Sequence, residues 1–433
     1  MRLVILMVLV LQWMEDSPYI NTHFRRRFKM DPLDVISNLD KVVPYFQPIY
    51  GADTQKCVGV EVVGRLKLEN LHSLEFFFAN DLVPDDYLLE VDNHILIQAL
   101  DEVVQSKFEG GIFINRHPSA LLSDDPENLL SILQSYEEKG IQLNKTVIIL
   151  QHQLFYGFEK ELKNLITYYQ TYGIKFAINS VNEKLINLEK LRFLSPDIIK
   201  IDFKMVQQLH TSSFQDLLNS VIYVARKVGA SMYYDGIIDS IQLRNAWKNG
   251  GRFYQGAYLF TPQPSISQLN HECEPLKNDI LKYIRGEKNK LIALRDITNL
   301  IQLKVETAIN KFKLEEDLNS FLTNLSSELN SFCFRMYICD EDGFQQSANL
   351  FKVNGEQWEL QEKYKGRNWS WRPYFLETVL KMQSNDQGQL SDMYRDIETG
   401  EKIRTFSYPM NNGSYLYIDL SYEFLFKHNE LLF

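Results

Sequence analysis

Cysteine is scarce in this sequence, and the spacing of its few cysteines excludes two familiar kinds of site. The 433 residues include only Cys57, Cys273, Cys333 and Cys339. These form neither a CxxC motif nor the Cys and His spacing of a zinc site. We therefore expect free thiols in a protein that occupies a reducing compartment.

An excess of basic residues is also missing. The chain has 46 Lys and Arg residues against 56 Asp and Glu residues, so its formal net charge is −10. Phosphate backbones are held by clustered Lys and Arg side chains, and this balance therefore argues against a general nucleic-acid-binding protein. The net charge does not exclude binding of a small anionic ligand, because a few local donors are enough to bind one.

The apolar run near the N-terminus is too short to span a membrane. Residues 2–14, RLVILMVLVLQWM, fall short of the roughly 20 residues that a spanning helix needs, and no small-residue cleavage site follows them. A basic cluster precedes Met30 and consists of Arg25, Arg26, Arg27 and Lys29. We interpret residues 1–29 as a tail or an overcalled start, in preference to an interfacial membrane anchor, and we predict a cytoplasmic protein.

What the sequence does contain is a repeated alternation of short apolar runs and longer amphipathic segments. The apolar runs are strand-like: VGVEVV (58–63), GIFIN (111–115), TVIIL (146–150), IKFAIN (174–179), IIKID (198–202), SMYYD (231–235) and FYQGAYL (253–259). Between them, residues 158–172 and 214–228 carry apolar side chains at the spacing of an amphipathic helix. The alternation predicts the α/β class, and the count of strands favours a (β/α)8 barrel over a doubly wound sheet.

The character of the sequence changes after Pro275. Residues 276–330 carry Leu and Ile at helical spacing between Lys and Glu, which predicts a helical connector. From Phe332 the pattern alternates, and FRMYICDEDG and RTFSYPMNNGSYLYIDL each contain strands beside an Asp-Gly or Asn-Gly turn. We expect four segments: a tail at 1–29, a barrel at 30–270, a connector at 271–330 and a small antiparallel α+β domain at 331–433.

Lys200 and Asp202 are the charged pair that most clearly invites a functional interpretation. They are two residues apart on a predicted strand, so both side chains point to the same face of the sheet. In one interpretation the two charges neutralise each other, as buried charges must. In the other, Lys200 holds a phosphate oxygen of a ligand at the end of the strand. The residues alone leave both interpretations open.

Five short motifs occur in an order that resembles the EAL family. They are FQPIY (46–50), GVEVVGRL (59–66), FIN (113–115), KID (200–202) and YQGAYLF (254–260). That family comprises cyclic di-GMP phosphodiesterases and their inactive relatives, and the resemblance runs from about Asp31 to Pro262. Further on, NWSWRPYF and ETGEKIRTFSYPM resemble YkuI-type EAL proteins of bacilli, in which a TIM-like barrel is followed by a PAS or Cache-like sensory domain.

The resemblance implies which residues form the nucleotide site. Glu61 stands where the family has the Glu of the EAL motif, Asn115 where it has an Asn ligand to metal, and Lys200 where it has the catalytic Lys. Asp235 takes the place of the first Glu of the AEGVE segment and is one methylene shorter. The positions that contact the nucleotide in the family are matched here by Gln47, Arg65, Asp202 and Gln255.

Several carboxylates that the resemblance leads us to expect are missing. Where the family binds metal ions through Glu or Asp, this chain has Ile149, Asn179, Ser180 and Ile238. Two-metal hydrolysis needs both ions held about 3.5–4 Å apart, and Glu61 with Asn115 alone makes a poor site. We predict that hydrolysis is lost or very weak. Mg²⁺ or Mn²⁺ would bind only if a residual site forms, and otherwise we expect no cofactor.

Three functions are compatible with these residues. The leading hypothesis is a homodimeric cyclic di-GMP signalling protein, catalytically inactive, that acts by nucleotide binding or by conformational signalling through a sensory domain. The second is a weakly active phosphodiesterase in which Glu61, Asn115, Lys200 and Asp235 hold one metal ion. The third is a partner-binding module without nucleotide, with the helical connector as its interaction surface.

Two smaller groups of residues carry competing interpretations. His117 and His152 with Glu61 would make a zinc site, but lone histidines are mostly structural or exposed, and we favour that interpretation. In the C-terminal domain, Arg372 and Arg404 lie among Trp and Tyr residues and are our candidates for binding a carboxylate or another small ligand. We interpret most of the aromatic side chains as packing. The sequence names no ligand for this domain.

Overall fold

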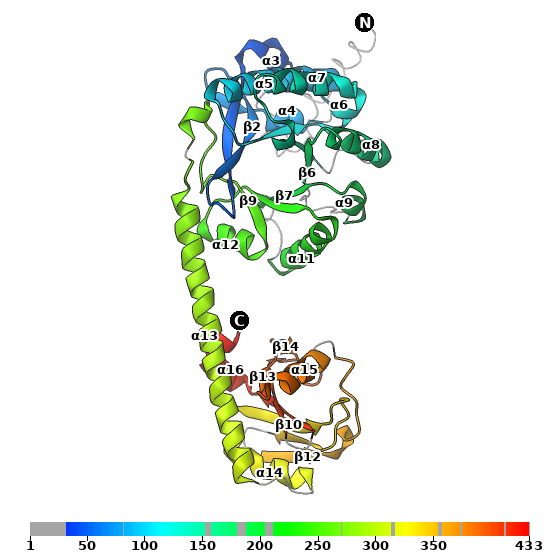
Figure 1. The fold of residues 1–433 in the computed structure, drawn as a ribbon, viewed down its shortest axis with the longest axis vertical. Helices are drawn as coiled ribbons and strands as arrows, with labels where there is room; N and C mark the ends of the chain where they lie inside the picture. Colours follow the sequence, from blue (N-terminus) through cyan, green and yellow to red (C-terminus); the bar gives the residue numbers. More distant parts are fainter. Residues whose placement is uncertain are drawn as a thin grey trace, which may run out of the picture. The chain divides into compact units, whose positions relative to one another are not determined.

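The computed structural model describes most of the chain in two compact units. The described residues are 32–80, 82–151, 157–179, 188–203, 211–269, 271–312, 317–353, 357–372, 375–410 and 413–432. The first unit is Met1–Tyr283 and the second is Ile284–Phe433, and Figure 1 colours both along the sequence. The predicted tail at 1–29 lies outside the described residues. Within them, no helix combines the length and the apolar character that crossing a membrane requires.

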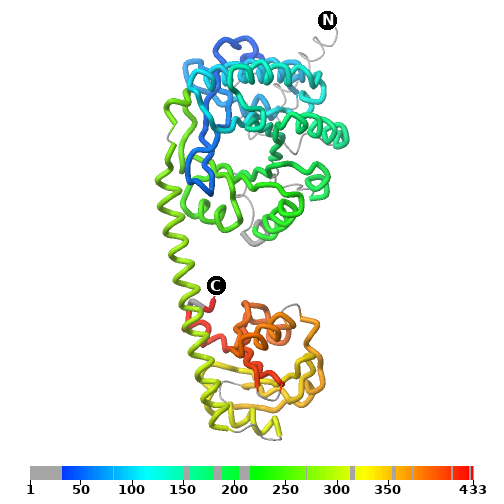
Figure 2. The backbone as a smooth tube through the Cα atoms, viewed as in Figure 1, coloured from blue at the N-terminus to red at the C-terminus, as the bar shows by residue number. Residues whose placement is uncertain are grey.

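Nine described strands of the first unit form one sheet, and eight of them close into a barrel. In their order around the barrel, the eight are β1 (Val42–Gly51), β2 (Cys57–Lys67), β4 (Gly111–Arg116), β5 (Thr146–Gln151), β6 (Lys175–Asn179), β7 (Ile198–Asp202), β8 (Ser231–Asp235) and β9 (Gly251–Tyr254). β2 and β4 to β9 pair in parallel, whereas β1 is antiparallel to both of its neighbours, β2 and β9. The short β3 (Leu71–Ser73) pairs with β2. The predicted (β/α)8 barrel is confirmed, and Figure 2 traces its backbone.

Strand β1 contains two prolines and still pairs with β2 along its length. Proline lacks an N–H donor and is normally unfavourable inside a sheet, which is why the strand pattern of the sequence omits β1. The N–H of Phe46 donates to Gln263 O at 2.7 Å, on the side away from β2. Alternate N–H groups of a strand point to the same side, so the nitrogens of Pro44 and Pro48 also face away from β2. Neither proline therefore removes a donor that β2 needs.

Helices cover the outside of the barrel. In the first unit they include α3 (Pro32–Ser37), α4 (Glu75–Phe78), α5 (Asp85–Ser106), α6 (Pro118–Ser123), α7 (Pro126–Glu137), α8 (Glu159–Gln170), α9 (Leu188–Leu194), α11 (Thr211–Val228) and α12 (Ser240–Lys248). The helices predicted at 158–172 and 214–228 are confirmed as α8 and α11. Helices α7 and α12 each begin with an aspartate cap, and in α12 the Asp239 carboxylate accepts from the N–H groups of Ile241 and Gln242.

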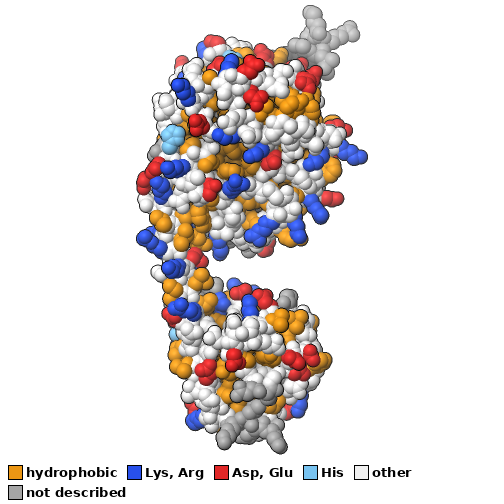
Figure 3. Space-filling model, in the orientation of Figure 1, with side chains coloured by type: hydrophobic (Ala, Val, Ile, Leu, Met, Phe, Trp, Pro, Cys, Tyr) orange, Lys and Arg blue, Asp and Glu red, His pale blue; other side chains and the backbone are white. Residues whose placement is uncertain are grey.

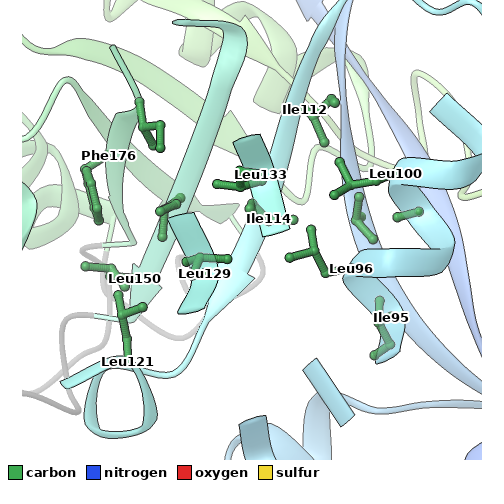
Figure 4. Close-up of a cluster of buried hydrophobic side chains, with 14 of the residues drawn as sticks. Ile95, Leu96, Leu100, Ile112, Ile114, Leu121, Leu129, Leu133, Leu150 and Phe176 are labelled. Atoms are coloured by element: carbon green, nitrogen blue, oxygen red, sulfur yellow. The ribbon is translucent and has the colours of Figure 1, made fainter. Parts of the chain in front are cut away.

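The largest core of the first unit lies between the barrel and the helices that surround it. Figure 4 shows Leu96 and Leu100 of α5 beside Ile112 and Ile114 of β4. Each of the four is at most 3% exposed, and burying a side chain of this size contributes roughly 1.5–3 kcal/mol. Because Ile112 and Ile114 face outward, the alternation of β4 turns Asn115 into the barrel.

Inward side chains fill the barrel below the polar strand ends. A buried apolar cluster there is made of Ile49, Phe113, Val147, Ile149, Ala177, Ile198 and Tyr233. An eight-stranded barrel is just wide enough inside for side chains to fill. This cluster, called the interior cluster below, is the floor beneath the candidate site.

The second unit is built on a six-stranded sheet whose paired strands are antiparallel. Its order is β12 (Gln357–Gln361), β11 (Asn349–Val353), β10 (Cys333–Cys339), β17 (Tyr415–Leu420), β16 (Thr405–Pro409) and β13 (Gln389–Leu390). Beside it are α14 (Leu318–Leu329), α15 (Phe375–Asn385), α16 (Tyr422–Lys427) and a hairpin of β14 (Tyr394–Arg395) and β15 (Lys402–Ile403). The predicted antiparallel α+β domain is confirmed, and its PAS or Cache-like character stays a prediction.

Helix α13 (Glu274–Lys311) begins in the first unit and ends in the second. In the second unit, Ile301 and Val305 of α13 are buried in one core with Phe321 of α14 and Ile338 of β10. The later part of the predicted connector therefore contributes to the hydrophobic core of the second unit.

Figure 3 shows acidic and basic side chains interspersed over the visible face of the molecule, with no large patch of one sign.

Candidate functional site

Polar side chains converge inside the barrel above the interior cluster. Glu61 comes from β2, Asn115 from β4 and Lys200 from β7, while Tyr233 and Asp235 come from β8. All five face inward because their outward neighbours on each strand pack against helices. The structure thus brings together Glu61, Asn115, Lys200 and Asp235, as the sequence predicts.

The Glu61 carboxylate is the centre of this group. Its Oε1 accepts from Asn115 Nδ2 at 2.9 Å and from Lys200 Nζ at 2.7 Å. Its Oε2 accepts from Lys200 Nζ at 2.6 Å and from the Tyr233 hydroxyl at 2.7 Å. Glu61 is only 4% exposed, so these protein donors replace the water that would otherwise solvate the charge.

Lys200 is held between two carboxylates. Its ammonium lies 2.9 Å from Asp235 Oδ2 in addition to its contacts with Glu61. Burial alone would lower the pKa of Lys200, but the charges of Asp235 and Glu61 outweigh it and raise that pKa above its ordinary value. The lysine is therefore a permanent cation at neutral pH, and Glu61 and Asp235 both contribute to its neutralisation. Asp202 pairs in register with Asp235.

Tyr233 is the member of the site that sequence reasoning missed. Its side chain is fully buried, and burial together with the Glu61 carboxylate raises the pKa of its hydroxyl well above the ordinary value. The hydroxyl therefore stays protonated and donates to Glu61. The available signal was its position two residues before Asp235, which puts both side chains on the inner face of β8.

The positions of the missing carboxylates are neutral where the structure describes them. Ile149 is fully buried in the interior cluster, in register with Asn115 on β4 and Ala177 on β6. Asn179 ends β6 opposite Lys200, and Ile238 lies in the loop after β8 with 49% of its surface exposed. Ser180 lies outside the described residues. Within the described ranges, no group of three or more His, Cys, Asp or Glu side chains is arranged to hold a metal ion.

Two of the residues predicted to contact the nucleotide lie next to each other. Gln255, which is buried, donates from Nε2 to Gln47 O at 3.3 Å, and Gln47 donates from Nε2 to Phe260 O at 3.4 Å. Arg65 lies four residues beyond Glu61 on β2 and donates to Gly64 O at 2.9 Å. Partial burial lowers the pKa of Arg65 from its ordinary value. These side chains flank the strand ends, and their nucleotide-binding role stays a prediction.

His117 takes part in a local hydrogen-bond chain. Its Nδ1 lies 2.8 Å from Ser119 Oγ, and Ser119 Oγ donates to Asp85 Oδ1 at 2.6 Å. These hydrogen bonds fix the start of α6 against the start of α5. His152, the second histidine of the zinc alternative, lies outside the described residues.

The two arginines predicted to bind a ligand in the second unit have different surroundings. The Arg372 guanidinium lies over the Trp369 ring, 4.6 Å from its centroid, and near the Trp371 and Tyr394 rings at 5.8 and 5.9 Å. Arg404 is buried and donates from Nε to Leu431 O at 2.7 Å and from Nη1 to Ser391 O at 2.8 Å. Arg372 is thus the one of the two whose guanidinium lies among aromatic rings, and both ligand roles stay predictions.

A third arginine of the second unit, Arg335, was not singled out by the sequence. It is buried on β10 and forms ion pairs with Asp419 of β17, with Asp396 at 2.8 Å and with Glu398 at 3.1 Å. Burial alone would raise the pKa of Asp396, but the hydrogen bond and charge of Arg335 lower it below the ordinary value. Because Asp396 and Glu398 follow β14, Arg335 fastens the β14 and β15 hairpin to the central strands.

The chain matches two families along its length. The family described as "EAL domain" matches residues 34–262, and the one described as "EAL-domain associated signalling protein domain" matches residues 268–432. An uncharacterized EAL-domain containing protein of Bacillus subtilis strain 168, YkuI, is 40% identical over 408 residues, which is 93% of this chain and 100% of that protein.

A solved structure shows the same likeness. The crystal structure of Bacillus subtilis YkuI, in complex with substrate c-di-GMP and calcium, has a TM-score of 0.82 at 39% identity and covers 93% of this chain and 100% of that one. The FimX EAL domain of Pseudomonas aeruginosa bound to c-di-GMP has a TM-score of 0.48 at 19% identity, over 56% of this chain and 99% of that one.

Proposed function

This chain belongs to the EAL family, and from that premise we propose that it is a cyclic di-GMP signalling protein whose barrel binds the nucleotide and hydrolyses it very weakly or not at all. The observation that carries the proposal is Ile149. A fully buried isoleucine, packed in an apolar cluster, stands where the resemblance places a metal-binding glutamate. The crystal structure of YkuI with c-di-GMP supports the choice of nucleotide.

Weak hydrolysis follows from the donor set. Metal-assisted phosphodiester hydrolysis depends on two divalent ions held by several carboxylates. Glu61, Asp202 and Asp235 are carboxylates on the inward face of their strands, and Lys200 already neutralises part of the charge of Glu61 and Asp235. Asn179 and Ile238 add no negative charge to the site, so the dehydration of a second ion has little to offset it.

The second unit completes the proposed signalling protein. We propose that it is a sensory domain whose ligand binds near Arg372, and that the protein forms homodimers in the cytoplasm. The domain match at residues 268–432, described as belonging to EAL-associated signalling proteins, supports this role. Nucleotide binding or release in the barrel would then be coupled to the second unit through a change in conformation.

A weakly active phosphodiesterase is the second candidate function. The observation in its favour is that Glu61, Asn115, Lys200 and Asp235 lie together at one site. Mg²⁺ or Mn²⁺ would be needed only in this case. A partner-binding module without nucleotide remains the third candidate.

One sample can separate the candidates. Calorimetric titration of the purified full-length protein with cyclic di-GMP, with Mn²⁺ and again with a chelator, is expected to show binding heat. The same sample should release no linear dinucleotide on prolonged incubation with Mn²⁺, alongside an active phosphodiesterase as positive control. Rapid linearisation would favour the enzyme, and the absence of heat in both conditions would leave the partner-binding module.

A further inference from the structure

The hydrogen bonds of Glu61 leave no lone pair of its carboxylate for another ligand. An ionised carboxylate offers about four acceptor positions. Four protein contacts occupy them: Asn115 and Lys200 at Oε1, and Lys200 and Tyr233 at Oε2. All four distances lie between 2.6 and 2.9 Å, which is the range of strong hydrogen bonds to a charged acceptor. A metal ion could reach this carboxylate only by displacing a protein donor.

Tyr233 cannot easily give way. Its ring is fully buried in the interior cluster and lies in edge contact with Phe113, with centroids 5.8 Å apart, and with Phe253 at 6.3 Å. Closely packed protein interiors allow few alternative rotamers for a ring. The hydroxyl is thereby fixed against Oε2, and the Lys200 ammonium lies 4.9 Å from the centroid of the same ring.

Asn115 also directs the NH2 group of its amide, and not its oxygen, toward Glu61. Its Nδ2 group lies between two acceptors, Glu61 Oε1 at 2.9 Å and Val62 O at 3.5 Å. Turning the amide over would place its oxygen against those oxygens. The amide therefore acts as a donor in this site and not as a ligand to metal.

We propose that Lys200, Tyr233 and Asn115 close the Glu61 carboxylate to divalent ions, so that the Lys200 ammonium is the resident cation of the site and any nucleotide binds without metal. A divalent ion at Glu61 would lie within a few ångströms of this ammonium in a buried environment, where the repulsion between them is strong. Tyr233 is the positioning residue that fixes the closed arrangement. The inference rests on the proposed function for the nucleotide, but the closure of Glu61 can be tested alone.

The test is Mn²⁺ binding by the full-length protein, followed by calorimetry and by the melting temperature. The wild type is expected to show neither heat nor a shift with millimolar Mn²⁺. Lys200→Met, which leaves Glu61 and Asp235 without their cation, is expected to bind Mn²⁺ roughly tenfold or more tightly than the wild type. Tyr233→Phe keeps the ring and frees one lone pair of Oε2, so its affinity for Mn²⁺ should rise by less than that of Lys200→Met. This variant provides the test if Lys200→Met fails to fold.

Tyr234→Phe is the matched control. Tyr234 is the buried neighbour of Tyr233 on β8, and its hydroxyl donates to Asn249 O at 3.0 Å, away from the site. Its variant should behave toward Mn²⁺ as the wild type does. Wild-type protein that binds Mn²⁺ as tightly as Lys200→Met would overturn the closure, whatever the nucleotide does. A closed site with no heat from cyclic di-GMP would instead refute the proposed function alone.

Discussion

Ile149 illustrates how a single side chain determines whether the barrel floor is apolar or charged. It is fully buried in the interior cluster, where a carboxylate would be difficult to solvate. We predict that Ile149→Glu lowers the free energy of unfolding of the first unit by about 3–5 kcal/mol, as expected for a buried charge without a partner. Urea unfolding followed by circular dichroism measures the change.

The control for this substitution is Ile149→Val. It removes one methylene from the same cluster and should cost about 0.5–1.5 kcal/mol. An Ile149→Glu variant as stable as Ile149→Val would contradict the prediction. It would show that the pocket already supplies a counter-charge for a carboxylate at this position.

At the residue scale, the sequence predicts the charged and amide members of the site better than its tyrosine. Glu61, Asn115 and Lys200 stand out because polar side chains interrupt apolar strands. Tyr233 does not stand out, because a tyrosine in an apolar strand is normally interpreted as packing. Its partner Glu61 is 172 residues away along the chain, and only the closed barrel brings the hydroxyl and the carboxylate together.

At the scale of elements, the β14 and β15 hairpin depends on Arg335. Its guanidinium binds Asp396 and Glu398 near the turn of the hairpin and Asp419 on β17. Arg335→Met would leave Asp396 and Asp419 buried without a cation. We predict a loss of about 3–5 kcal/mol in the stability of the second unit, with amide hydrogen exchange rising first in residues 394–403. Exchange followed by mass spectrometry measures both effects.

Arg395→Met is the matched control for the hairpin. Arg395 lies on β14 itself and is exposed, so its removal should change stability by no more than about 0.5 kcal/mol. If the two variants exchanged alike across residues 394–403, the fastening role of Arg335 would be wrong.

Most elements of both units could be predicted from hydrophobic spacing, and the exceptions have physical causes. β1 was missed because Pro44 and Pro48 are unusual in a strand, and only its neighbour Gln263 explains why they are tolerated. The sequence predicts a helical connector, but its Leu and Ile pattern does not say which residues cover these side chains. In the structure, Ile301 and Val305 are covered by the second unit itself.

For the whole molecule, the continuity of α13 is the feature most open to test. Gly286 lies within this helix, three residues after the end of the first unit. Apart from its chain neighbours and the nearby helix backbone, no atom of the described residues lies within 4 Å of where its Cβ would be. Gly286→Pro should destabilise the helix locally by about 3 kcal/mol, because proline removes a hydrogen bond and clashes with the preceding turn. We predict faster limited proteolysis close to residue 286, measured by mass spectrometry of the fragments.

Gly286→Ala is the control at the same position. Alanine fits the open surroundings and favours the helix by roughly 0.5–1 kcal/mol, so cleavage there should slow relative to the wild type. Equal cleavage rates in the alanine and proline variants would mean that α13 is already interrupted near this point.

The pairing of β1 with both β2 and β9 also determines when the barrel can close during synthesis. β1 pairs with β2 along one edge and, through Tyr50 and Gly51, with Phe253 and Tyr254 of β9 along the other. Residues up to Tyr254 must therefore be synthesised before β1 can pair with β9 and close the barrel. Until then the nascent chain has two unpaired strand edges, which are prone to wrong pairings. Chaperone capture should thus be greatest just before β9 emerges and fall sharply afterwards.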